Sequence, residues 1–63
     1  MMALWAGLQL TMATAAAVET GAPVREVLPH VEVVMARHLF DEQSLSGMLE
    51  MLDEAIASWR EVN

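Results

Sequence analysis

The chain has 63 residues, of which 56% are apolar, and its formal net charge is −6. So short a chain forms one domain at most, and so apolar a composition argues against disorder. Cysteine is absent, which excludes disulfides and thiolate metal ligands. A chain of this length buries so little surface that it is only marginally stable by itself, and a disulfide, a metal ion or an oligomer usually supplements such a fold. We therefore expect a second chain to complete the fold.

The charge balance excludes one class of partner. The chain has nine carboxylates but only three arginines and no lysine. Proteins bind nucleic acids largely through cationic side chains. We therefore expect no direct binding of nucleic acid. The negative charge fits a basic protein partner, although an acidic surface that keeps the chain dispersed is the simpler interpretation.

The first predicted element is a helix over about residues 3–19, within which residues 3–18 carry no charge. Such a helix is apolar on nearly all sides, which is typical of a buried helix. One chain of this size has too little material to cover both sides, so a second copy or another protein would complete the burial. Large residues form one predicted stripe and small residues the other. The first stripe is Met1, Trp5, Leu8, Met12 and Ala15, and the second is Ala3, Ala6, Leu10, Ala13 and Ala17.

The same segment could be a targeting or membrane element. Residues 15–17 are alanines and resemble the cleavage site of a signal peptide. However, no basic residue precedes Arg25, and the residue that follows the uncharged segment is Glu19. A membrane span needs about 20 strongly apolar residues, and this segment is shorter and partly polar. We therefore expect a cytoplasmic protein. The alternative is a small membrane-associated peptide whose first segment inserts in lipid.

A second helix is predicted over about residues 23–39. Gly21 suits the position after a helix, and Pro23 suits the first turn of the next one. Pro29 lies within the segment and removes a backbone donor, so it either kinks the helix or begins a new one. Residues 31–34 also fit a short strand, but the helical period continues to Leu39 without a turn signal.

The third helix is predicted over about residues 44–61, after a break in which Asp41 or Ser44 can serve as the cap. Its apolar residues recur every three or four positions, with acids on the other faces. The chain 1–63 is therefore predicted to be a single all-α domain, a bundle of about three helices completed by self-association. The apolar positions are Leu45, Met48, Leu49, Leu52, Ala55, Ile56, Trp59 and Val62.

Residues suited to catalysis or metal binding are few. His30 with Glu26, or His38 with Glu42, could hold a metal ion weakly, but a zinc site needs three or four convergent ligands. Ordinary side-chain pairs are the simpler interpretation. No nucleophile motif and no phosphate loop is present. We expect no enzymatic activity, no cofactor and no metal.

These observations favour a regulator or inhibitor that forms a homodimer or larger oligomer and binds an unidentified protein partner. Apolar stripes would carry the association and acids would orient a basic partner. Met51 lies off the main stripe of its helix, so we expect it to face outward. The predicted interface residues are Trp5, Leu8, Met12, Met51, Leu52, Ile56 and Trp59, and the predicted acidic rim is Glu50, Asp53, Glu54 and Glu61.

Overall fold

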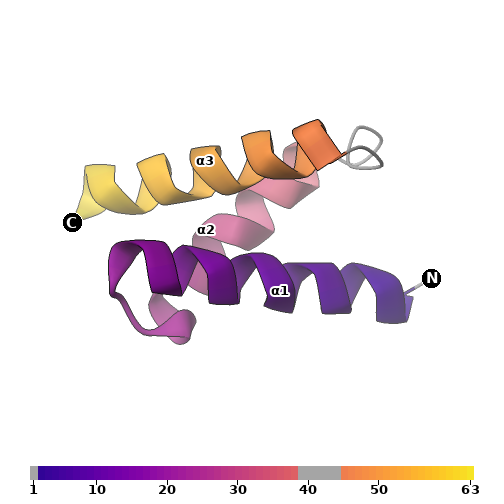
Figure 1. The fold of residues 1–63 in the computed structure, drawn as a ribbon, viewed down its shortest axis with the longest axis horizontal. Helices are drawn as coiled ribbons and strands as arrows, with labels where there is room; N and C mark the ends of the chain where they lie inside the picture. The colour runs from indigo at the N-terminus through magenta and orange to yellow at the C-terminus, as the bar shows by residue number, and fades with distance from the viewer. Residues whose placement is uncertain (1, 39–44) are drawn as a thin grey trace.

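The computed structural model describes residues 2–38 and 45–63 of the chain. Three helices pack together: α1 (Met2–Thr20), α2 (Val24–Arg37) and α3 (Leu45–Val62). Helices α1 and α3 run side by side in the same direction, and α2 crosses behind them in the opposite direction (Figure 1). The described residues contain no strand, so the predicted all-α class is confirmed. Contacts join every pair of helices and are most extensive between α2 and its two neighbours.

The turn between α1 and α2 is built by Thr20 and Gly21. Gly21 has a φ of +77°, a left-handed conformation in which glycine carries no steric cost. Its N–H donates to the carbonyl of Ala17 at 2.8 Å. The Thr20 hydroxyl donates to the carbonyl of Ala16 and accepts a hydrogen bond from the N–H of Ala22. Pro23 is extended and directly precedes α2, so the reversal after α1 is local.

Helix α2 runs through Pro29, so the predicted alternative of a new helix at that residue is wrong. Proline leaves the carbonyl four residues earlier, that of Arg25, without its helical donor. Both Arg25 and Pro29 are exposed, so water can replace the lost donor. The strand alternative for residues 31–34 is also wrong, because these residues are helical. The predicted caps Asp41 and Ser44, and the predicted helix end at Leu39, lie outside the described residues.

The core lies where the three helices meet, and α2 supplies its centre. Four α2 side chains are buried at helical spacing, which places them on one face of the helix. In the described residues no buried side chain is polar or charged, so apolar burial and close packing hold the bundle together. The core residues are Val27, Val31, Val34 and Met35 of α2, Met12, Ala13 and Ala16 of α1, and Met51, Ala55 and Ile56 of α3.

Helix α1 buries a narrower face than its composition predicts. Met12, Ala13 and Ala16 are buried, whereas Leu10 and Val18 remain 53% and 80% exposed. The buried face therefore runs between the two predicted stripes and takes residues from each. One chain therefore leaves a side of α1 uncovered, as the sequence predicts for so short a chain, because α2 and α3 both pack against the same side of α1.

Candidate interaction surfaces

Most of the predicted interface residues form this chain's own core. Met12, Met51 and Ile56 are at most 7% exposed, so they are not free to contact another protein. Leu8 and Leu52 are partly buried and pack against the same core, as does Trp59. The side chain of Trp5, the remaining predicted residue, lies outside the described part of the chain. The large apolar side chains of α3 that do remain exposed are Leu45, Leu49 and Val62.

The expectation that Met51 faces outward is wrong, because its side chain is 1% exposed. Helix α3 packs against α2 as well as α1, and its buried arc extends toward Met51 and Ala55. The opposite edge of the apolar stripe is left uncovered, so Leu45 and Leu49 are exposed instead. Hydrophobic spacing located the stripe, but the position of α2 decided which of its edges is buried.

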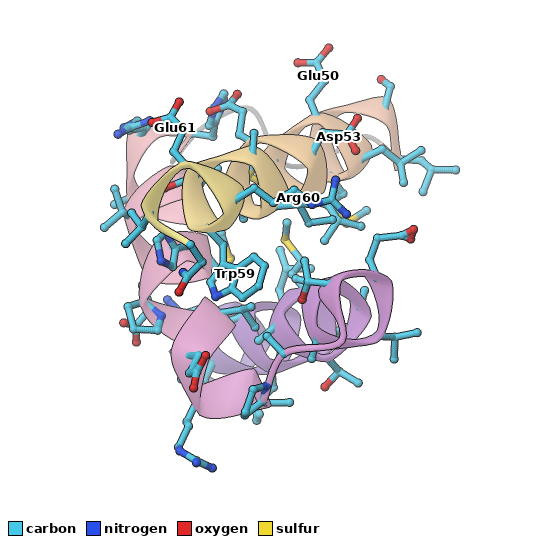
Figure 2. The ribbon with its side chains drawn as sticks, turned by 90° about the vertical axis from the view of Figure 1, so that its left-hand side faces the viewer. Glu50, Asp53, Trp59, Arg60 and Glu61 are labelled. Carbon is cyan, nitrogen blue, oxygen red and sulfur yellow. The ribbon has the colours of Figure 1, made fainter. Side chains whose placement is uncertain are left out.

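The four acids predicted to form a rim are all exposed on α3. Glu50, Asp53 and Glu61 lie on the side of α3 that faces away from α1 (Figure 2). Glu54 is also exposed, but its Oε2 lies 3.0 Å from Nε2 of His38 on α2. Three of the four acids are therefore directed to solvent, and Glu54 joins two helices of the same chain.

The two histidines connect α2 to α3. Nδ1 of His30 lies 2.8 Å from Oγ of Ser58, a half-buried hydrogen bond, and His38 pairs with Glu54. The pairing of His30 with Glu26 considered from the sequence is not the contact that forms, and Glu42 lies outside the described residues. Spacing along one helix cannot reveal partners on a neighbouring helix. Within residues 2–38 and 45–63, no group of three His, Cys, Asp or Glu side chains could hold a metal ion.

Trp59 projects from α3 into the space between the helices (Figure 2). Its ring packs against the core, and its Nε1 is buried with no hydrogen-bond partner in the described structure. Leaving a buried donor unpaired costs about 1–3 kcal/mol, which the burial of a large aromatic ring can offset. Trp59 is therefore a packing residue of this chain that carries one unsatisfied polar atom.

One exposed surface of the described residues is a face of α1 that carries no charge. We call it the outer face of α1, and each of its residues is exposed. The hydroxyls of Thr11 and Thr14 donate to the carbonyls of Gly7 and Leu10 at 2.9 and 2.8 Å. Both hydroxyls are thereby partnered within the helix. The outer face of α1 consists of Gly7, Leu10, Thr11, Thr14, Ala15 and Val18.

A second exposed apolar surface lies on α3, where Leu45 and Leu49 are 70% and 52% exposed. Their spacing of four residues places them one turn apart on the same side of the helix. Asp53 lies one turn further along the same row. Glu50, three residues before Asp53, lies next to it on the helix surface. We call these four residues the leucine–acid edge of α3.

Comparison of the chain with protein-family models, with curated proteins and with solved structures gives no match. None of the three described helices combines the length and the hydropathy that crossing a membrane requires. The function of the chain must therefore be inferred from its two exposed surfaces and its charge.

Proposed function

We propose that this chain is a non-enzymatic protein-interaction protein, of the regulator or inhibitor type, that self-associates and binds a basic protein partner. The observation that carries the proposal is that large apolar side chains remain exposed beside a core that is already closed. Leu10, Val18, Leu45 and Leu49 are each more than half exposed. They do not complete the core of this chain, and grouped exposed apolar residues commonly mark interaction sites.

The leucine–acid edge supports a basic partner in particular. Leu45 and Leu49 offer one apolar turn, and Glu50 and Asp53 place negative charge directly beside it. An amphipathic helix with basic flanks would bury the leucines and pair its cations with the carboxylates. The net charge of −6 would speed the encounter with such a partner at low salt.

The experiment is affinity capture with the immobilised protein, comparing Glu50→Lys with Glu32→Lys. Both substitutions reverse an exposed glutamate, but Glu32 is on α2, away from the leucine–acid edge. A partner that binds this edge should be recovered by the wild type and by Glu32→Lys and lost with Glu50→Lys or Leu49→Glu. Equal recovery by all four proteins would remove the edge from the proposal.

The alternative, in which α1 associates with lipid, predicts a different result. Its apolar outer face would insert into the boundary between the headgroups and the acyl chains of a bilayer. The protein would then sediment with lipid vesicles and form no oligomer in solution. Co-sedimentation that Val18→Glu abolishes, together with a monomeric mass in the absence of lipid, would replace the proposal above with this one.

A further inference from the structure

We propose that the outer face of α1 binds the same face of a second copy of this chain, with the two α1 helices antiparallel and Gly7 of each copy facing Val18 of the other. This inference rests on the self-association proposed above and specifies its surface and geometry.

The distribution of charge selects a second copy as the occupant. Two chains of charge −6 repel each other unless their acids are kept apart. Glu50, Asp53 and Glu61 lie on the side of α3 that faces away from α1 (Figure 2). Pairing through the outer face of α1, which carries no charge, therefore keeps these acids far from the interface.

The residues of this face suit contact better than they suit exposure to water. A solvent-exposed helix face ordinarily carries lysine, glutamate or other strong helix formers. Here Gly7, Thr11 and Thr14 are weak helix formers. A Cβ added at Gly7 would meet nothing within 4 Å in this chain, so packing within the chain does not require glycine. Close approach of a second backbone would require it.

The antiparallel arrangement follows from the order of large and small residues. A two-fold axis level with Met12 and Ala13 brings Gly7 opposite Val18 of the second copy, and Thr11 opposite Thr14. The isopropyl group of Val18 then fills the space that Gly7 leaves. A parallel pair would instead oppose valine with valine and glycine with glycine, and would bring the two Glu19 carboxylates together.

Helix dipoles favour the same arrangement. In the antiparallel pair, Glu19 lies opposite residue 6 of the second copy, about one turn from the start of its α1, where the exposed backbone N–H groups carry partial positive charge. Both copies contribute the same surface, so the dimer closes without leaving a free face for further copies.

The available area predicts a weak dimer. Helix α1 has 19 residues and is about 28 Å long at 1.5 Å per residue. Contact along one face of such a helix buries roughly 400 Å² per chain, about half of what a stable interface of standard size buries. The total surface of the chain is 4277 Å², so about a tenth of it would be covered. We therefore expect the dimer to dissociate on dilution through the micromolar range.

Disulfide trapping tests the geometry, because the chain has no cysteine of its own. Gly7→Cys and Val18→Cys proteins are mixed under mild oxidation, and each is also oxidised alone. The proposal predicts a mixed Gly7→Cys/Val18→Cys dimer, with little dimer from either variant alone. In the antiparallel pair the two positions 7 are about 16 Å apart along the helix axis, beyond the reach of a disulfide. Mixed Thr11→Cys and Thr14→Cys proteins provide a second pair, which keeps the test valid if one cysteine disturbs α1.

Each outcome of this experiment decides the proposal. A disulfide between two Gly7→Cys chains would show a parallel pair and overturn it. Trapping no greater than that of Ala57→Cys, an exposed position on α3, would also overturn it. If sedimentation shows a dimer while neither pair is trapped, self-association stands and this surface is wrong. If the wild type remains monomeric throughout the micromolar range, self-association fails as well.

Discussion

Helices α1 and α3 lie side by side and pack against the same third helix, yet their outer faces differ completely. The outer side of α3 carries Glu50, Asp53 and Glu61, whereas α1 carries no charge before Glu19. Their inner faces differ as well, because α1 buries two alanines and one methionine, while α3 buries Met51, Ala55 and Ile56. The side of α3 opposite its core is therefore marked for water by its acids, whereas no side of α1 is marked in this way before Glu19.

The largest expected effect comes from the inner face of α3. Met51→Ala should lower the free energy of unfolding by about 2–5 kcal/mol, because a fully buried side chain is replaced by a cavity. Urea denaturation followed by circular dichroism measures the change. The control is Leu49→Ala on the same helix, which is half exposed and should cost about 1 kcal/mol or less. Equal losses from the two variants would contradict the burial described for α3.

The buried alanines of α1 should be sensitive to added side-chain volume. Ala16 is fully buried, so Ala16→Leu should destabilise the chain by about 1–3 kcal/mol through overpacking. Ala15→Leu inserts the same side chain at the preceding residue, which is exposed. It should change stability by about 0.5 kcal/mol or less when measured at a concentration where the chain is monomeric. If Ala15→Leu is the more damaging variant, α1 is rotated so that Ala15, not Ala16, faces the core.

Substitutions on the outer face of α1 should weaken dimerisation and leave the free energy of unfolding almost unchanged. Val18→Glu and Leu10→Glu place a charge on this face, and each should weaken dimerisation at least about tenfold, equivalent to about 1.4 kcal/mol. Sedimentation velocity over a dilution series measures this. Ala57→Glu adds the same charge at an exposed position of α3, and its dissociation constant should stay within about threefold of the wild-type value. A charge at Leu8, which the sequence also predicts to lie in the interface, would not isolate association, because Leu8 packs against the core and its replacement also disturbs folding.

The smallest expected change is at Gly7, within α1, and it is compared with Gly21, in the turn that follows α1. Gly7→Ala should raise the stability of the monomer by about 0.5–1 kcal/mol, since alanine favours the helix and its Cβ meets nothing. Gly21→Ala should lower stability by about 1 kcal/mol or more, because the φ of +77° is strained for alanine. Thermal unfolding at low concentration distinguishes the two. A stabilising Gly21→Ala would argue against the turn described after α1.

The sequence by itself determined the helical class and the approximate extent of the helices. Spacing of apolar residues is a local property, and Thr20, Gly21 and Pro23 mark a chain reversal whatever surrounds them. The acidic face of α3 was equally predictable, because charges must remain in water when the opposite side of the helix is buried.

Only the tertiary structure decided which face of α1 is buried. Without charges before Glu19, no side of this helix is marked for solvent, so the packing of its small residues against α2 and α3 settled its rotation. The burial of Met51 and the pairing of His30 with Ser58 and of His38 with Glu54 were decided in the same way. Each depends on contact between helices distant in sequence, and the period of a single helix contains no information about where its neighbours lie.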